Sequence, residues 1–385
     1  MKLGSNNFAQ NPHAQLAALD CRVLIRYDPI HVNSRMTQAE LVKTYMRNVF
    51  NIPENREFMW SGYSSEPILA EAAAHLLNDS PGIVQRAADI LEAALKGGLL
   101  ARGERGELVA RTLFTVAHDQ AIVREYRDTP SDPRFHRPLR LLALLENLLA
   151  PDIWATVRKA KPFHAHTGDP TFENAFENAW VNFTHFVQLG DHASFNLHCA
   201  SQLLKRGAAM QAFDNQYNMD VGLPLLFGDP SKTIINEDNT SIGQAQIKNT
   251  SKAVRVFPDP EFVGSSKKEL PIFSLIMQLG VDTNNAGVVC HTTDKSVDAP
   301  AGHTRSSRNP PPHDVRRRHY VITIYGCTSK TYACIPANTV AYRHLLRAQK
   351  PFTNFPRSGC QDNVSSLYAL KPMIYDQQGV CMPWS

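Results

Sequence analysis

The chain lacks most of the features that mark a secreted, membrane-spanning or disulfide-stabilised protein. Its 385 residues contain no uninterrupted apolar run of about 18 residues, which is the minimum for a membrane-spanning helix. The first residues, MKLGSNNFAQNPHAQ, have no apolar stretch of the kind found in a secretory signal. Seven cysteines at irregular spacing fit reduced thiols better than a disulfide framework. These absences predict an intracellular protein, cytoplasmic or nuclear, that does not contact a membrane.

The common catalytic motifs are also missing. No G-x-x-x-x-G-K-[ST], no G-x-G-x-x-G after a strand and no G-x-S-x-G occurs in the sequence. Cys327 and Cys334 lie near several histidines, but their spacing is not that of a known zinc finger. His118-Asp119 is a single pair without further ligands at regular spacing, so we interpret it as the polar part of a buried helix.

The net charge of +4 is unevenly distributed. Residues 301–350 contain nine Lys or Arg and one acid, which gives this window +8 and leaves −4 for the remainder of the chain. Such a block attracts a polyanion when it is folded onto one surface, and Arg316, Arg317 and Arg318 are then the candidate nucleic-acid contacts. The same composition is equally typical of a solvated, disordered loop.

The first part of the chain is expected to be helical. Apolar residues recur at helical spacing in several segments, for example at Ile83, Ala87 and Leu91. The same segments offer no nucleophile, metal cluster or phosphate-binding loop. We therefore expect an N-terminal extension over 1–34, followed by an α-helical domain over 35–160 that serves interaction or scaffolding.

The remainder, 161–385, has the pattern of an α/β domain. TFENAFENAWVNFTHFVQLGD predicts an aromatic-rich helix, and SFNLHCASQLLKRG predicts a second helix. The β-like runs AAMQAFD, MDVGLPLLF, SIGQAQIKN, PIFSLIMQLG and RHYVITIYG predict a mixed sheet. A segment rich in Pro, Arg and small residues, 284–317, predicts a disordered basic insertion. The expected fold class is α+β, with an N-terminal α-helical domain followed by an α/β domain.

Two of the predicted strands each have one face that begins polar. Side chains alternate between the faces of a sheet, so one face of MDVGLPLLF carries only apolar residues while the other begins with Asp220. In SIGQAQIKN, one face is small or apolar and the other carries Gln246 and Lys248. Because the two runs are close in sequence, we expect them to be neighbouring strands whose polar ends meet.

The side chains at these two strand ends are of the types that phosphodiester hydrolysis uses. Asp220, the side-chain oxygen of Gln246 and the backbone carbonyl of Ile247 are hard oxygen donors, which Mg²⁺ accepts while keeping most of its waters. Lys248 would neutralise charge on a phosphorane-like transition state or orient a metal-bound water. The alternative is a Lys248 side chain that reaches solvent and an Asp220 that only begins a strand.

An Asp followed by Gln-x-Lys on consecutive strands resembles the PD-(D/E)xK restriction-endonuclease-like superfamily, whose commonest form has Glu at the position of Gln246. The wider chain resembles a large family of fungal proteins, related to the endonuclease-like C-terminal domains of Crinkler-type effectors and transposon-associated proteins. The shared segments, which span most of residues 55–385, are SSEPILAEAAAHLLN, GLLARGERGELVARTLFTVAHD, VNFTHFVQLGD, AQIKN and IMQLGV.

The resemblance implies a restriction-endonuclease-like α/β domain with a mixed sheet. It implies that Asp220 and Gln246 bind Mg²⁺ or Mn²⁺, that Lys248 is the catalytic lysine, and that Glu173 or Glu177 supplies an additional acid. Gln246 departs from the common pattern because it brings no negative charge, which lowers the expected metal affinity.

The sequence therefore predicts a Mg²⁺-dependent nuclease acting on DNA or RNA. The alternative is a catalytically inactive relative with the same fold, which binds nucleic acid or protein. A third possibility is an effector-type protein that engages a protein partner through its helical domain.

Overall fold

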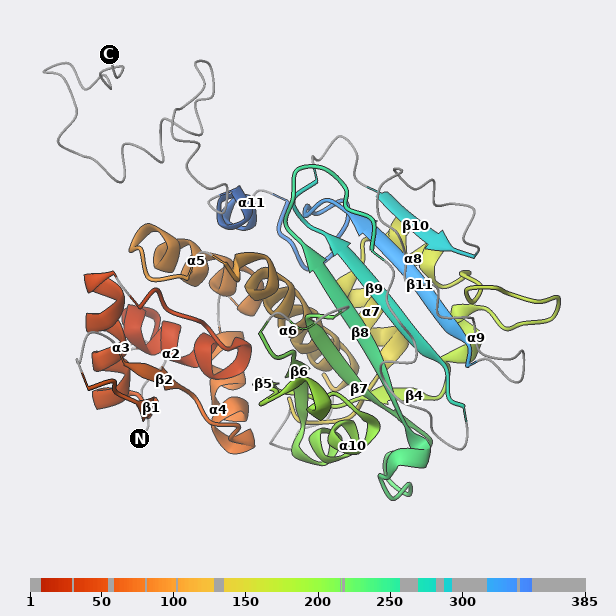
Figure 1. Cartoon of the computed structure of the whole chain (residues 1–385), viewed down its shortest axis with the longest axis horizontal. Helices are drawn as coiled ribbons and strands as arrows, with labels where there is room; N and C mark the ends of the chain where they lie inside the picture. The colour runs from red at the N-terminus through yellow and green to blue at the C-terminus, as the bar shows by residue number, and fades with distance from the viewer. Residues whose placement is uncertain are drawn as a thin grey trace, which may run out of the picture.

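A mixed β-sheet with helices on both faces lies at the centre of the protein, as the computed structural model shows (Figure 1). The structure describes residues 8–29, 31–54, 59–79, 82–101, 103–127, 135–214, 216, 219–256, 269–281, 287–292, 317–337 and 340–347. Within these ranges the chain combines ten α-helices with a nine-stranded sheet and a separate two-stranded sheet. The mixed α/β architecture expected from the sequence is thus confirmed.

The large sheet is mixed in strand direction. Its strands are β3 (Leu139–Arg140), β4 (Ala179–Val181), β5 (His185–Gln188), β6 (Ala208–Gln211), β7 (Val221–Phe227), β8 (Thr240–Lys248), β9 (Ile272–Gln278), β10 (Gly287–His291) and β11 (His319–Tyr325). The main path runs β10-β11-β9-β8-β7-β4-β3, and β6 joins β7 to β5. Strands β8, β9 and β11 are parallel to one another, whereas β7 is antiparallel to β8. The five β-like runs predicted from the sequence are all strands of this sheet.

The helices are distributed along the whole described chain. They are α2 (Pro12–Val23), α3 (Val32–Thr44), α4 (Pro67–Asn78), α5 (Ile83–Lys96), α6 (Arg105–Glu125), α7 (Leu141–Leu148), α8 (Pro151–Val157), α9 (Phe172–Ala175), α10 (Leu197–Arg206) and α11 (Ala341–Arg347). The small sheet is the antiparallel pair β1 (Asn48–Asn51) and β2 (Trp60–Gly62), and two 3₁₀ turns occupy His192–Ser194 and Glu237–Asn239. None of these helices has the length and apolar content that crossing a bilayer requires.

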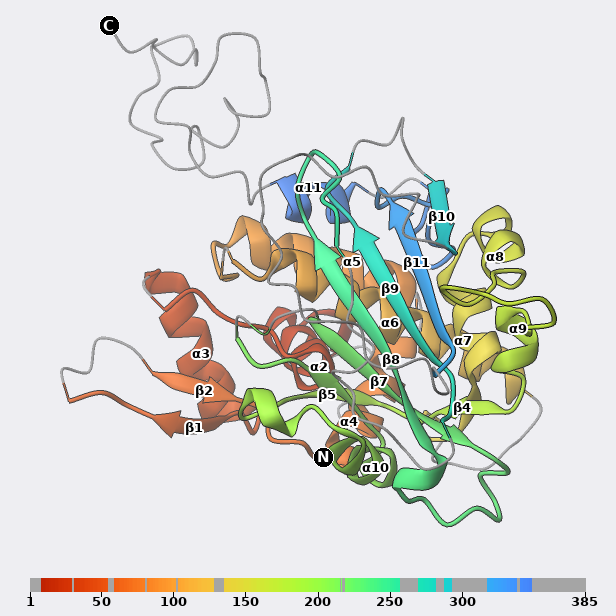
Figure 2. The ribbon, with the colours of Figure 1, turned by 45° about the vertical axis from the view of Figure 1, so that its right-hand side comes forward.

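Alternation along β7 and β8 produces two different faces of the sheet. Val221 and Ala245 point to the face that packs against α6, within the larger hydrophobic core, and Figure 2 shows α5, α6 and α7 together on that side. Gly222 and Ile242 point to the other face, against α10 and Phe195, where a smaller core forms. A Cβ atom on Gly222 would lie 2.6 Å from the Phe195 ring, so only glycine allows this close approach. We refer to these surfaces as the α6 face and the α10 face.

The larger hydrophobic core is continuous from the N-terminal helices to the sheet. It includes Phe8 at one end of the chain and Leu346 at the other, with Val116 of α6 and Leu223 of β7 between them. The predicted boundary near residue 160 therefore does not coincide with a break in the packing. The predicted N-terminal extension, 1–34, contains α2, whose apolar residues are part of this core.

A fully buried ion pair also joins the helices to the sheet. Nη2 of Arg22 in α2 lies 2.8 Å from Oδ1 of Asp119 in α6, and both side chains are completely inaccessible to solvent. Nε of Arg22 donates to the backbone oxygen of Thr184, immediately before β5, at 2.8 Å. Asn78 of α4 donates to Asp119 as well. The His118-Asp119 pair is thus a structural element of the helix, as expected.

One predicted helix is wrong. The aromatic-rich segment around 171–191 forms the single turn α9 and then the strands β4 and β5. The spacing of its aromatic residues fits a helix, but tertiary pairing decides the outcome, because β4 pairs with β7 and β5 pairs with β6. The second predicted helix is confirmed as α10, which Asn196 caps by accepting the backbone N–H of Cys199.

The predicted basic insertion, 284–317, is in part a strand. Residues 287–291 form β10, which pairs antiparallel with β11 at the edge of the sheet. Residues 293–316, which include Arg316, lie outside the described residues.

Candidate active site at the end of strand β8

The pairing of β7 with β8 brings Asp220 and Gln246 together. Val221 lies opposite Ala245 in the antiparallel register, so the preceding residue, Asp220, is next to Gln246. Directly opposed residues of an antiparallel pair share a face, and Lys248 follows Gln246 on that face two residues later. The structure therefore places Asp220, Gln246 and Lys248 on one face, at the end of β8.

Hydrogen bonds hold the Asp220 residue at this strand end. Its backbone N–H donates to the oxygen of Ala245 at 3.0 Å, which continues the ladder one step beyond β7. Its side-chain Oδ2 accepts the backbone N–H of Ile247 at 2.6 Å. The carboxylate is thus oriented by the strand that carries Gln246 and Lys248, which is the close connection the candidate site requires.

The side chain of Gln246 contains a buried oxygen with no hydrogen-bond donor. Its Oε1 atom is inaccessible to solvent and accepts no hydrogen bond. Leaving such an atom unpaired costs free energy, so an unpaired acceptor here requires an explanation. Gln244, two residues earlier on the same face, also has a buried Oε1 without a hydrogen-bond donor, although its amide nitrogen donates to Ser274 at 2.7 Å.

The first turn of α6 approaches the same strand end. A Cβ atom on Gly106 would lie 3.3 Å from Ile247 and 3.1 Å from Asn249, so the helix begins almost in contact with the end of β8. Glu107, the next residue, is close enough that its charge acts on Asp220. We call Asp220, Gln246, Lys248 and Glu107 the β8-end cluster.

Burial and charge in the β8-end cluster act on Asp220. Burial is the largest cause of a rise in the pKa of this carboxyl group to about 6, and the negative charge of Glu107 adds to it. The hydrogen bond from Ile247, the ammonium of Lys248 and the guanidinium of Arg111 act in the opposite direction. A carboxyl group whose pKa is raised by burial and by a like charge is typical of a site that gains stability when it binds a cation.

A second layer of charged groups surrounds the cluster. Arg26 forms ion pairs with Glu104, at the start of α6, and with Asp214, before β7. Burial raises the pKa of Glu104 to about 7, while Arg111 and Arg26 lower it. The fully buried Arg111 donates to the oxygens of residues 23 and 24 at the end of α2, and its Nη1 lies 3.7 Å from Oε2 of Glu107. The N-terminal helices therefore supply both charge and support to this strand end.

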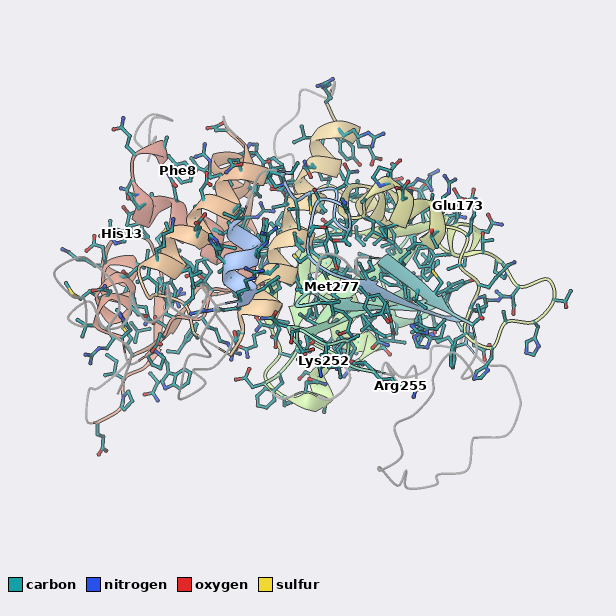
Figure 3. The ribbon with its side chains drawn as sticks, turned by 90° about the horizontal axis from the view of Figure 1, so that it is seen from above. Phe8, His13, Glu173, Lys252, Arg255 and Met277 are labelled. Atoms are coloured by element: carbon teal, nitrogen blue, oxygen red, sulfur yellow. The ribbon has the colours of Figure 1, made fainter. Side chains whose placement is uncertain are left out.

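The two acids proposed from the resemblance lie elsewhere. Glu173, in α9, pairs with Arg158, and Figure 3 shows it far from Met277, which is the residue of β9 opposite Ile247. Glu177 is exposed and precedes β4, which pairs with the far end of β7. Neither belongs to the β8-end cluster, because the segment that carries them forms strands rather than the expected helix.

The predicted nucleic-acid contacts lie at the opposite end of the sheet. Arg317 and Arg318 precede β11, and Arg317 donates to Leu270 and Ser241, near the start of β8. Lys248 follows Ser241 by seven positions along the strand, a distance of about 23 Å. Arg318 pairs with Asp169 on the surface. Internal bonding of Arg317 reduces its availability for phosphate.

The donor atoms of the β8-end cluster fit a hard divalent cation. Asp220 supplies a carboxylate, and the unpaired Oε1 of Gln246 supplies a neutral oxygen of the type that Mg²⁺ accepts. Among the described residues, no group of three or more His, Cys, Asp or Glu is arranged to hold a metal ion. A cation at this site would therefore keep several of its waters, as Mg²⁺ usually does.

Comparison with known proteins gives one match. The model of a domain of unknown function, DUF8736, matches residues 7–129, which run from the start of the described chain to just beyond α6. No curated protein and no solved structure matches the chain. The matched region includes Glu104, Glu107 and Arg111.

Sequence reasoning missed Glu107 as a member of the cluster. Its segment, GERGELVARTLF, was interpreted only as the start of an amphipathic helix. The signal available was a pair of acids at the start of a helix, with Glu104 as the N-cap residue and Glu107 in the first turn. Placing that turn at β8 required the tertiary packing.

Proposed function

We propose that the protein is a Mg²⁺- or Mn²⁺-dependent nuclease that cleaves phosphodiester bonds of DNA or RNA at the β8-end cluster. The observation that carries this proposal is the shared face of Asp220, Gln246 and Lys248 at the end of β8, with Glu107 of α6 close enough for its charge to act on Asp220. Asp220 comes from the start of β7, Gln246 and Lys248 from the end of β8, and Glu107 from the first turn of α6.

Each side chain has a separate task in this proposal. Asp220 and Gln246 hold the cation through their oxygens, and Glu107 adds negative charge that favours its binding. A cation held by Asp220 and Gln246 would supply Lewis-acid chemistry for phosphodiester hydrolysis. Lys248, whose ammonium acts on Asp220, offsets the charge that develops on the phosphoryl oxygens in the transition state.

One observation favours a second candidate, an inactive endonuclease-like module that binds nucleic acid or protein. The carboxylate of Asp220 is already occupied in part by the backbone N–H of Ile247, and the neighbouring strand contributes an amide instead of a second carboxylate. A protein with this arrangement could keep the fold and lose metal affinity. A protein partner bound through the N-terminal helices, as the sequence predicted, belongs to this second candidate.

A cleavage assay combined with a metal titration distinguishes the two. The purified full chain is incubated with single- and double-stranded DNA and RNA in Mg²⁺, Mn²⁺ or EDTA, and Mn²⁺ binding is measured by calorimetry. We expect metal-dependent cleavage that Asp220→Asn abolishes together with Mn²⁺ binding. The matched control is Asp229→Asn, an exposed acid just beyond the far end of β7. Absence of cleavage of all four substrates, with no heat of Mn²⁺ binding, would leave the inactive module as the function.

A further inference from the structure

A serine, a histidine and an arginine from three separate elements meet beside the start of α4. Ser65 lies two residues before this helix, His185 begins β5, and Arg206 ends α10. The Oγ atom of Ser65 is 2.8 Å from Nε2 of His185, and it accepts a hydrogen bond from Nε of Arg206 at 2.6 Å. These residues are separated by 120 and 141 positions in sequence, and none belongs to the β8-end cluster.

The hydrogen bonds orient the imidazole of His185 toward the serine hydroxyl. Nδ1 of His185 lies 3.0 Å from Oγ1 of Thr184, which in turn lies 3.4 Å from the backbone oxygen of Gly207. With the Thr184 hydroxyl donating to that oxygen, it accepts the Nδ1 proton of His185. The Nε2 atom is then the acceptor for the hydroxyl proton of Ser65, which is the arrangement of a nucleophile, a base and an orienting group.

The imidazole of His185 is in the uncharged form that a general base requires. His185 is buried, which is the largest cause of a fall in its pKa to about 4, and the charges of Arg22 and Arg206 lower it further. At neutral pH the ring is therefore uncharged and Nε2 is free to take a proton. A base of low pKa needs an acidified nucleophile, and the guanidinium of Arg206 on the Ser65 oxygen favours the alkoxide.

Positive electrostatic potential is available beside the hydroxyl for a developing oxyanion. Arg206 also donates through Nη2 to the backbone oxygen of Ser65, so the guanidinium is held in place. The N-cap of α4, Glu66, makes no side-chain capping bond to the first turn. Helix N-termini stabilise negative charge. Ser65 itself is half-buried between the exposed residues Ser64 and Glu66, so a small molecule can reach its hydroxyl.

We propose that Ser65 is the nucleophile of a second site, which hydrolyses small carboxylic esters with His185 as its general base. The Ser65 oxygen bonds to the ester carbonyl carbon while its proton passes to Nε2 of His185. Collapse of the tetrahedral adduct breaks the ester C–O bond, and the leaving alcohol takes the proton from His185. Water then attacks the acyl carbon and gives a proton to His185. The bond between that carbon and the Ser65 oxygen breaks, the oxygen takes the proton back from His185, and the carboxylic acid is released. Thr184 is a positioning residue.

Covalent labelling of the full chain tests this proposal independently of the nuclease activity. The protein is treated in EDTA with a fluorophosphonate probe, the modified peptide is identified by mass spectrometry, and hydrolysis of p-nitrophenyl acetate is followed in parallel. We expect a single adduct on Ser65 that Ser65→Ala removes. The matched control, Ser64→Ala, alters the adjacent exposed serine and is expected to label like the unmodified protein.

The histidine variants decide whether the base takes part. His185→Gln is expected to slow labelling and ester hydrolysis by about 100-fold or more, which is the usual contribution of a general base. Because this variant changes a buried residue, Thr184→Val and the surface variant Arg206→Gln are measured beside it, and thermal unfolding of each is recorded. Both are expected to retain the fold and to label more slowly. No adduct on Ser65 in the unmodified protein, or an unchanged labelling rate in all three variants, would overturn the proposal.

Discussion

At the scale of single residues, the β8-end cluster is defined by an amide in a position that would suit a carboxylate. The unpaired oxygen of Gln246 lies next to Asp220, whose own carboxyl group is raised in pKa by burial and by Glu107. The site therefore holds less negative charge than three acids would supply. Substitutions at individual positions test whether this limited charge is sufficient for the proposed chemistry.

Replacing Gln246 with Glu is expected to increase Mn²⁺ affinity by about tenfold, because one added charge at contact distance is worth roughly 1–2 kcal/mol in a partly buried site. In EDTA the same change is expected to lower the free energy of unfolding, because the new carboxylate lies next to Asp220. Calorimetry and urea unfolding measure the two effects. Gln246→Leu, which removes the oxygen at similar volume, is the control and should weaken binding. Equal affinity in all three proteins would argue against metal contact at this position.

Lys248→Ala is expected to lower kcat for cleavage by about 100-fold or more and to change the substrate Kd little, because its proposed role is confined to the transition state. Single-turnover cleavage and fluorescence anisotropy with the same labelled substrate separate the two quantities. Lys252→Ala, which removes another lysine shortly after β8, is the control. A loss of binding that equals the loss of rate would show that Lys248 acts only in holding the substrate.

The free energy of unfolding is expected to depend on pH through His319. Burial lowers the pKa of this imidazole to about 3, with Arg317 as a second cause, and its Nε2 is 2.7 Å from Oγ of Ser274. The unfolded chain binds the proton near pH 6.5 and the folded chain does not, so stability falls as pH decreases from 6.5 toward 3. The loss is at most about 5 kcal/mol. His319→Gln should reduce the decrease in the free energy of unfolding between pH 6.5 and 3, as measured by urea unfolding. Replacing the exposed His13 in the same way should leave that decrease unchanged.

At the scale of elements, strand β8 carries the polar strand end and, earlier along the strand, a glycine that lies unusually close to an aromatic ring of β9. A Cβ atom on Gly243 would lie 2.2 Å from the ring of Phe273 on β9. The Phe273 ring therefore lies across Gly243 at a distance that only glycine permits. This packing fixes the register that carries Gln246 and Lys248 to their places.

Gly243→Ala is expected to destabilise the protein by about 1–3 kcal/mol, because the added methyl must displace Phe273 in a filled core. Urea unfolding measures the change, and Gly103→Ala is the control, since a Cβ there meets nothing within 4 Å. Because the substitution disturbs the β8–β9 pair, cleavage by the variant should also decrease. A stability within 0.5 kcal/mol of the unmodified protein, roughly the range of neutral surface changes, would contradict the packing argument.

The elements differ in how far their sequence determines them. Five strands and α10 were predictable because period-2 alternation and an N-cap asparagine are local signals. The segment that forms β4 and β5 was not, since its aromatic spacing fits either structure and its pairing partners are distant. The shared face of Gln246 and Lys248 followed from alternation, whereas that of Asp220 also required the β7–β8 register. The contribution of Glu107 was not predictable, because no local pattern indicates which strand a helix terminus approaches.

At the scale of the whole molecule, the N-terminal helices and the sheet share one core and a buried ion pair. Arg22 contacts Asp119 in α6 and the backbone before β5, so a single side chain crosses the boundary predicted near residue 160. The region matched by DUF8736 is therefore packed as part of the same structure as the candidate site.

Arg22→Met is expected to destabilise the protein by about 3–5 kcal/mol, because it leaves Asp119 buried without its counter-charge. Since the pair joins helices and sheet, far-UV circular dichroism and tryptophan fluorescence should report one coincident transition at lower urea. Arg158→Met, which removes the surface pair with Glu173, is the control and should cost about 1 kcal/mol or less. Two separate transitions in the unmodified protein would indicate independent domains.

The shared core has a consequence for synthesis on the ribosome. Helix α6 packs against β8, and helices α2 to α5 share one hydrophobic core with it and with β7 and β9, strands that are translated more than one hundred residues after α6 begins. Until those strands leave the exit tunnel, the nascent helices present uncovered apolar surface. The shared core therefore cannot close until those strands have emerged, and the newly made N-terminal part is the segment most in need of a chaperone.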